Sequence, residues 1–143
     1  NVLAIGCGFF DGLAFETSSK AAFFSSGALE FRMLAVALGA KKDTFDLGSQ
    51  SWLGDLLTTS FGKSRNRLFG ELIGSGQTVK DALEQLAKEK KRSEGYLSAQ
   101  SFYLLAKEKD LKLPILTAIY SVLWEGMSVT NAIKLSFAPE SKL

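Results

Sequence analysis

The sequence predicts an all-α fold, for three reasons. Apolar residues recur at helical spacing along most of the 143-residue chain. No segment alternates convincingly between apolar and polar residues, as a half-buried strand requires. Glycine, proline and cap-forming serine, threonine and aspartate residues divide the chain into segments of helix length. Because no internal repeat is evident and the length suits one domain with a sizeable core, we expect residues 1–143 to form a single helical domain.

The longest predicted helix covers residues 19–38. Apolar residues recur there at helical spacing, among them Phe23, Leu29, Leu34 and Leu38. Ser18 or Ser19 is expected to cap its start, and Gly39 is expected to end it. We therefore expect a long, mostly buried helix.

The other helices are predicted from their caps. A turn-rich passage, KKDTFDLGSQS, leads into a short helix over residues 52–60. Ser64 is expected to cap a helix that runs to Ile73, where the glycines of GSGQ end it. Thr78 and Asp81 start the next helix, which ends in the charge run KEKKR. Three further helices are predicted over residues 96–107, 114–125 and 129–135.

Composition excludes several classes of function. The net charge is +2 and the basic residues form no stripe interleaved with aromatics, so we expect no nucleic-acid partner. The chain has no histidine and one cysteine, Cys7, which excludes a thiolate metal cluster and every nucleophile–histidine arrangement. Because Cys7 is the only cysteine, we expect a reduced compartment and no metal. Glu30 and Arg32 interrupt the apolar segment over 21–38, so we expect no membrane span.

The first twelve residues, NVLAIGCGFFDG, raise the question of a dinucleotide-binding fingerprint. Gly6, Gly8 and Gly12 are spaced much as in the strand-to-helix turn that holds a pyrophosphate, and Glu30 lies at a plausible distance for a ribose contact. However, two phenylalanines stand where backbone must approach phosphate, and the segments that follow are helical. The fingerprint is therefore disfavoured.

The segment SRNR, residues 64–67, is the sequence feature that most directly suggests a ligand. A helix N-terminus carries free N–H groups and partial positive charge, so arginines in its first turn are mildly unfavourable unless an anion compensates them. A phosphate would accept bonds from the amides and from a guanidinium. The alternative is that both arginines extend into water or pair with Glu71 or Asp81.

The chain resembles the C-terminal domain of NAD(P)-dependent glycerol-3-phosphate dehydrogenases. The resemblance rests on motifs that occur in the family's order over nearly the whole chain: NVLAIGCGFFDGL, SKAA, WLGDLL, SRNRLFGELIGSG, SEGY and LPILTAIYSVLWEG. It implies a helical bundle of the kind that 6-phosphogluconate dehydrogenases share in their C-terminal domains. In this reading the glycines after Asn1 belong to the first helix, and a separate N-terminal dinucleotide-binding domain is absent from the chain.

The resemblance implies reversible hydride transfer between NAD or NADP and dihydroxyacetone phosphate, which gives sn-glycerol 3-phosphate. In the family, a lysine immediately before the asparagine that corresponds to Asn1 is the general acid and base, so we expect this chain alone to be inactive. Asn1 would lie at the reacting oxygen, and Asp55 would pair with the lysine and contact the glycerol hydroxyls. The implied substrate-phosphate contacts are Thr59, Ser64, Arg65 and Asn66. The implied cofactor contacts are Arg65, Glu94 and Arg92.

Departures from the family pattern leave a second hypothesis open. The small-residue segment before the GDL motif reads GSQSW, with a bulky Trp52 and about two extra residues of spacing. A catalytically silent helical module that binds an anion or a partner protein through residues 64–67 is therefore the alternative.

The resemblance also bears on metabolism, assembly and location. It implies a role in glycerol 3-phosphate metabolism and phospholipid biosynthesis, and a cytoplasmic homodimer. The C-terminal SKL leaves a peroxisome-type organelle as an alternative location.

Overall fold

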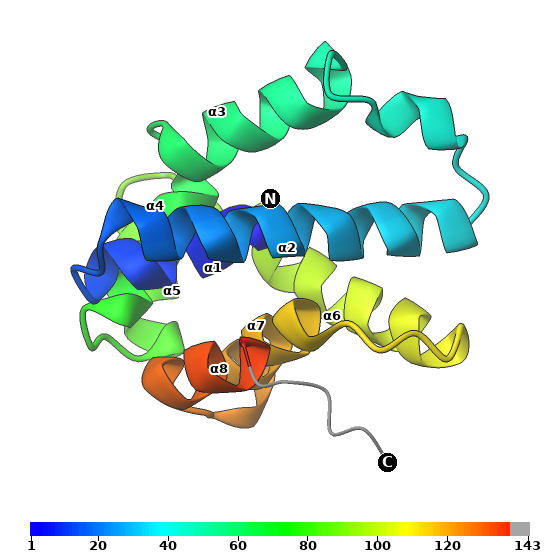
Figure 1. The fold of residues 1–143 in the computed structure, drawn as a ribbon. Coiled ribbons are helices and arrows are strands. Elements are labelled where there is room, and N and C mark those ends of the chain that lie inside the picture. The colour runs from blue at the N-terminus through cyan, green and yellow to red at the C-terminus, as the bar shows by residue number, and fades with distance from the viewer. Residues whose placement is uncertain (138–143) are drawn as a thin grey trace.

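Helices make up the structure of residues 1–137, which is the part of the chain that this computed structural model describes, and no strand occurs among these residues. Figure 1 shows their arrangement. The elements are α1 (Val2–Gly12), α2 (Thr17–Ala37), the 3₁₀ turn η1 (Lys42–Phe45), the π-helical turn η2 (Gln50–Gly54), α3 (Asp55–Phe61), α4 (Arg65–Gly74), α5 (Val79–Lys88), α6 (Glu94–Glu108), α7 (Pro114–Glu125) and α8 (Val129–Ser136). The all-α prediction is confirmed.

Helix α1 is the centre of the fold. Its residues from Val2 to Phe10 are all buried, and the helix contacts α2, α3, α4, α6 and α7. Helix α4 crosses it closely because both helices carry glycines at the crossing. A Cβ atom on Gly8 would overlap the Arg67 carbonyl oxygen, and one on Gly70 would overlap the Ile5 carbonyl oxygen. The glycines near Asn1 therefore serve helix packing, and no dinucleotide fingerprint is present.

The helix boundaries agree with the prediction at several ends and correct it at others. Helix α7 has the predicted bounds, and Gly126 follows it with a φ of 74°. Helix α2 begins at Thr17, so the predicted capping by Ser18 or Ser19 is wrong; Glu16 is the N-cap residue and makes no side-chain cap bond. The helix predicted over 52–60 begins instead as the π-helical turn η2, and its α-helical part starts at Asp55.

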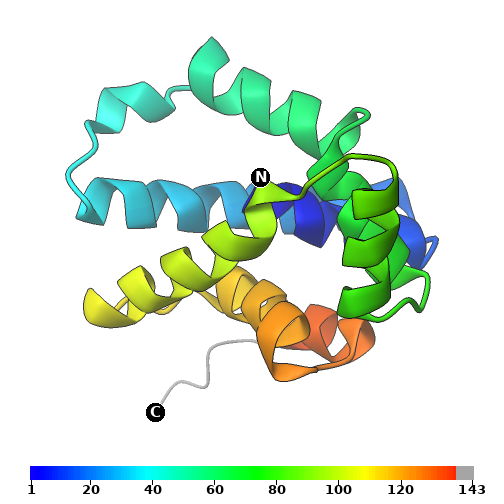
Figure 2. The same cartoon turned by 180° about the vertical axis from the view of Figure 1, so that it is seen from behind.

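The expectation that the long helix is mostly buried is also wrong. Leu29 of α2 and Leu38, the C-cap residue that follows the helix, are 55% and 45% exposed. Figures 1 and 2 show the segment that carries η1 and η2 above the C-terminal half of α2. Residues of both, among them Leu29 and Trp52, line a shared pocket, so this part of α2 is only partly covered.

A buried carboxylate joins α2 to α7. Glu30 is 8% exposed, and its Oε1 and Oε2 accept hydrogen bonds from the backbone N–H groups of Ile115 and Leu116 at 2.9 and 3.0 Å. These are otherwise unpaired donors in the first turn of α7, where the helix dipole also favours a negative charge. Glu30 is thus a capping residue supplied from another helix.

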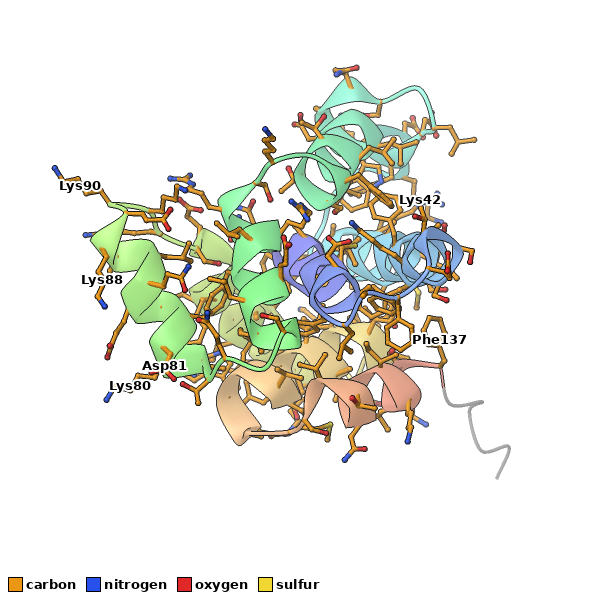
Figure 3. The ribbon with its side chains drawn as sticks, turned by 90° about the vertical axis from the view of Figure 1, so that its left-hand side faces the viewer. Lys42, Lys80, Asp81, Lys88, Lys90 and Phe137 are labelled. Atoms are coloured by element: carbon orange, nitrogen blue, oxygen red, sulfur yellow. The ribbon has the colours of Figure 1, made fainter. Side chains whose placement is uncertain are left out.

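The charged side chains of α5 project into solvent. Figure 3 shows Lys80, Asp81, Lys88 and Lys90 along α5 and just beyond it, pointing away from the other helices. Thr78 caps α5 as predicted, because its Oγ1 accepts from the Asp81 N–H at 3.1 Å. The SKL tripeptide, residues 141–143, lies outside the described residues.

Candidate functional site

The starts of α1, α4 and α6 meet at one place. A Cβ atom on Gly95 would lie 2.8 Å from the Asn1 carbonyl oxygen, so the first turn of α6 rests on the first residue of the chain. Asn66, in the first turn of α4, is 4% exposed; its Oδ1 accepts from Ser93 Oγ at 2.7 Å and from the Gly95 N–H at 3.0 Å. Figure 2 shows the N-terminus beside the start of α6.

Two residues predicted to contact the cofactor form an ion pair at this place. Arg65 Nη2 lies 2.9 Å from Glu94 Oε1, and the two side chains are 54% and 48% exposed. Exposed pairs of this kind contribute about 0–1 kcal/mol, so Arg65 can exchange Glu94 for another anion at little cost. Arg92 is also exposed, in the loop that leads into α6.

Ser64 caps α4, as predicted. Its Oγ accepts from the Arg67 N–H at 3.0 Å and donates to the Thr59 carbonyl oxygen at 2.7 Å. The hydroxyl proton of Ser64 is therefore already committed within the protein. Thr59 itself is half-buried near the end of α3.

Asp55 is the exposed first residue of α3. It follows η2 directly, where the Gly54 N–H donates to the Ser49 carbonyl oxygen five residues earlier, at 3.3 Å. Asp55 and Thr59 are four residues apart in α3, so they share one face of this helix. Among residues 1–137, no hydrogen bond or ion pair connects Asp55 to Asn1 or to the first turn of α4.

A cluster of charges that the sequence did not indicate lies beneath the α3–α4 turn. Asp11 accepts from Lys20 Nζ at 2.9 and 2.8 Å through its two oxygens, and from Arg67 Nη1 at 2.8 Å. Arg67 also pairs with Glu71 at 3.1 Å. Lys20 is 7% exposed, so it is a buried cation. Asp11 and Lys20 lie on different helices, which sequence periodicity cannot connect.

Carboxylates of the protein itself balance the positive charge of residues 64–67. Arg67 pairs with Glu71, one of the predicted alternatives, and not with Asp81, which belongs to the cap of α5. Arg65 pairs with Glu94. Because each arginine has a carboxylate partner, local charge alone does not require a bound anion.

Residues 64–67 lie at a pocket of their own. A pocket of about 260 Å³ is lined by Lys63, Ser64, Arg65, Arg67, Leu68 and Lys91. A larger pocket of about 670 Å³ lies between the α4–α5 and α7–α8 turns and is lined by none of the predicted site residues. Since binding chemistry depends on the groups that line a pocket, the smaller, basic pocket is the candidate.

Cys7 and the acidic groups offer no alternative site. Cys7 is completely buried, and burial raises the pKa of its thiol to about 12. Among residues 1–137, no group of three or more histidine, cysteine, aspartate or glutamate residues is arranged to hold a metal ion. No helix in this part of the chain is long and apolar enough to cross a membrane.

Comparison with known proteins decides the family. Residues 1–134 match the model of the family described as NAD-dependent glycerol-3-phosphate dehydrogenase C-terminus. The chain belongs to this family. The family match therefore confirms the resemblance that the sequence motifs indicated.

Individual relatives agree with the family match. The chain is 40% identical over 133 residues to "Glycerol-3-phosphate dehydrogenase [NAD(P)+]" of Bartonella tribocorum. This alignment covers 92% of this chain and 38% of the relative. The chain is 38% identical over 143 residues to the protein of the same name from Shewanella halifaxensis, covering 99% and 41%. The chain thus spans about two fifths of the length of the curated relatives it matches.

Solved structures show the same fold. The crystal structure of glycerol-3-phosphate dehydrogenase from Coxiella burnetii superposes with a TM-score of 0.84 at 30% identity, covering 94% of this chain and 40% of that one. The Saccharomyces cerevisiae glycerol-3-phosphate dehydrogenase structure gives a TM-score of 0.83 at 20% identity, covering 96% and 40%, which supports the fold alone. The helical arrangement is therefore that of the C-terminal domain of glycerol-3-phosphate dehydrogenases.

Proposed function

We propose that this chain is the substrate domain of an oxidoreductase that interconverts dihydroxyacetone phosphate and sn-glycerol 3-phosphate with NAD or NADP. The family membership and the relatives' names support the reaction. The observation that carries the proposal is the meeting of the α1, α4 and α6 starts, which places an exposed arginine and a buried asparagine beside Asn1. The remaining three fifths of such an enzyme would supply the dinucleotide-binding domain.

We assign the substrate phosphate to the first turn of α4. Arg65 would leave Glu94 and donate to two phosphate oxygens, because a planar guanidinium matches that geometry. Asn66 uses its Oδ1 within the protein, which leaves its Nδ2 amide for the ligand. Thr59 would add a hydroxyl donor from α3. Ser64 would donate its hydroxyl proton to the phosphate after releasing the Thr59 carbonyl oxygen, because phosphate oxygens only accept.

We assign the reacting carbon to the neighbourhood of Asn1 and Asp55. The nicotinamide, when bound, supplies or accepts the hydride. The lysine expected before Asn1 would move the hydroxyl proton, and the carboxylate of Asp55 would orient its ammonium group and contact the glycerol hydroxyls. Asp55 has no protein partner among residues 1–137 that would compete for this role, and its exposure leaves it free for a group from outside this domain. Arg92 and Glu94 would contact the cofactor.

We further propose that the enzyme is a cytoplasmic homodimer. Large apolar side chains are exposed on α2 and α6, including Leu29, Met33, Leu97 and Leu104. Groups of exposed apolar residues are typical of surfaces that another chain covers.

The test is steady-state kinetics on the full-length protein. Wild type is expected to oxidise NADH or NADPH with dihydroxyacetone phosphate. Asp55→Asn keeps the size of the side chain and removes the charge, so kcat/KM should fall about a hundred- to ten-thousandfold. Cofactor affinity, measured by fluorescence titration, should change little.

Asp110→Asn is the matched control, because Asp110 is exposed in the α6–α7 loop at a φ of 52°, which asparagine tolerates. It should keep wild-type kinetics. An inactive but folded wild type would refute the enzyme proposal and favour the silent module. A loss confined to cofactor binding in Asp55→Asn would refute the role of Asp55.

A further inference from the structure

The side chain of Arg67 connects the α3–α4 turn to two helices. Its Nε donates to the Gly62 carbonyl oxygen at 2.7 Å, and its Nη1 donates to Asp11 at 2.8 Å and to Glu71 at 3.1 Å. Gly62 lies in the turn, Asp11 on α1 and Glu71 one helical turn further along α4. One planar guanidinium therefore fixes where the turn stands relative to α1 and α4.

The main chain of Arg67 holds the same turn from the other side. Its N–H donates to Ser64 Oγ, and that hydroxyl donates to the Thr59 carbonyl oxygen. The segment from Thr59 to Ser64 is thus tied to α4 by two hydrogen bonds that both end on Arg67, and the bond from Ser64 to Thr59 closes the segment on itself. Arg65 and Asn66 follow this segment directly, so their orientation depends on it.

A second cation keeps Asp11 in place. Lys20 Nζ donates to both oxygens of Asp11. It also lies 4.7 Å from the centroid of the ring of Phe61, the last residue of α3. The side chains of Lys20, Arg67 and Asp11 are 9%, 20% and 24% exposed. Poorly solvated charges stay paired, because an unpaired charge is costly there. The cluster is therefore a fixed part of the structure.

We propose that Arg67 is a positioning residue for the phosphate site: held by Asp11, it fixes the α3–α4 turn so that Arg65 and Asn66 face the substrate phosphate. This rests on the proposed function. The charge of Arg67 is balanced by Asp11 and Glu71, whereas Arg65 has only an exposed partner. Arg67 thus acts through geometry, and Arg65 supplies the charge that the ligand meets.

The test compares two substrates in the full-length protein. Arg67→Lys keeps a cation near Asp11 but loses the fork that also reaches Gly62. With dihydroxyacetone phosphate, kcat/KM should fall about tenfold or more, mainly through KM, as expected when a charge-assisted hydrogen bond is lost. With dihydroxyacetone, which has no phosphate, kcat/KM should change by less than about twofold, because this substrate does not use the positioned groups.

Two further variants complete the design. Asp11→Asn removes the other end of the link and should give the same difference between substrates. Arg32→Lys, on α2, is the matched control and should match wild type with both substrates. An equal loss with both substrates would show general damage to the fold, and an unchanged value with dihydroxyacetone phosphate would show that the link is not needed. Either result overturns the proposal.

A binding measurement separates this proposal from the proposed function. Calorimetric titration with glycerol 3-phosphate and with inorganic phosphate needs no turnover, and Arg67→Lys should weaken both affinities about tenfold or more. If wild type binds these anions without catalysing the reaction, the proposed reaction fails, and the affinity ratio still decides the role of Arg67. If folded wild type binds neither anion, there is no phosphate site to position and the inference is wrong.

Discussion

Arg65 and Arg67 both occupy the first turn of α4, and their different surroundings give them different capacities. The guanidinium of Arg67 is mostly buried and makes hydrogen bonds with Gly62, Asp11 and Glu71. That of Arg65 is half exposed and has a single carboxylate partner. Exchange of partners is inexpensive only for the exposed group. Arg65 is therefore the residue through which we expect an anion to stabilise the fold.

This gives a prediction for the full-length protein. Glycerol 3-phosphate or sulfate at millimolar concentration should raise the melting temperature more than glycerol or an equal ionic strength of chloride, because only the anions bind the folded state. Arg65→Ala should remove most of that increase. Since a charge-assisted hydrogen bond contributes about 1.5–3 kcal/mol, the apparent affinity for glycerol 3-phosphate should weaken roughly ten- to a hundredfold.

Lys80→Ala changes the net charge by the same amount and is a control, because Lys80 projects into solvent from α5 (Figure 3). It should keep the full increase in melting temperature. An Arg65→Ala protein that is stabilised as much as wild type would place the anion site elsewhere.

Two opposing effects act on the pKa of the buried carboxyl group of Glu30. Burial raises the pKa of its carboxyl group above the usual 4.5, although the bonds from Ile115 and Leu116 act in the opposite direction. A carboxyl whose pKa is higher in the folded than in the unfolded state binds more protons when folded. Its contribution to stability is therefore greatest below the unfolded pKa and declines as the pH rises through the folded pKa.

Glu30→Gln tests this balance. The amide keeps one acceptor oxygen and leaves one buried backbone N–H unpaired, so unfolding free energy should fall by about 1–3 kcal/mol. Because glutamine does not titrate, the gap in melting temperature between wild type and the variant should narrow from pH 4 to pH 7. Glu84→Gln, at an exposed position on α5, should show no such trend. A gap that widens with pH would contradict the raised pKa.

At the scale of elements, the helices were predictable where local signals coincide with tertiary structure. Pro114 and Gly126 mark both ends of α7, and Ser64 and Thr78 are the caps of α4 and α5. Helix α2 was less predictable, because its apolar residues are spread around the helix and only some of them are covered. Which face is covered depends on where the η1–η2 segment runs, and this is a property of the whole fold.

The glycines of α1 show the limit of reading a local pattern by itself. The spacing of Gly8 and Gly12 is one residue longer than in a phosphate-binding turn and otherwise similar to it, yet each glycine lies against the backbone of α4. The partner glycines, Gly70 and Gly74, are more than fifty residues away. Close helix crossing and phosphate approach demand the same residue, so the sequence pattern alone does not separate them.

The family motifs indicated some residues of the candidate site and missed others. The family motifs pointed to Arg65, Asn66 and Glu94, and the structure brings these to the meeting point of three helix starts. The motifs did not reveal that Asp11 binds both Lys20 and Arg67, because these contacts join three helices. Residue roles that depend on ligand contact were open to inference from the motifs, and those that depend on packing were not.

At the scale of the whole molecule, one core runs through the described helices. Its buried apolar residues come from α1, α2, α4, α5, α6, α7 and α8, with α1 at the centre, as Figures 1 and 2 show. We therefore expect this core to form without a second domain. The proposed reaction, in contrast, needs a cofactor domain and a general base that would come from outside this chain.

The last prediction follows from this difference. The isolated 143-residue chain should give a helical circular dichroism spectrum and melt in one cooperative transition, because its core is continuous. It should not oxidise NADH with dihydroxyacetone phosphate, because it holds neither a dinucleotide-binding domain nor the lysine expected before Asn1. Measurable turnover by the purified chain would show that the reacting groups lie within these residues. A broad, non-cooperative melt would show instead that the core requires the rest of the enzyme.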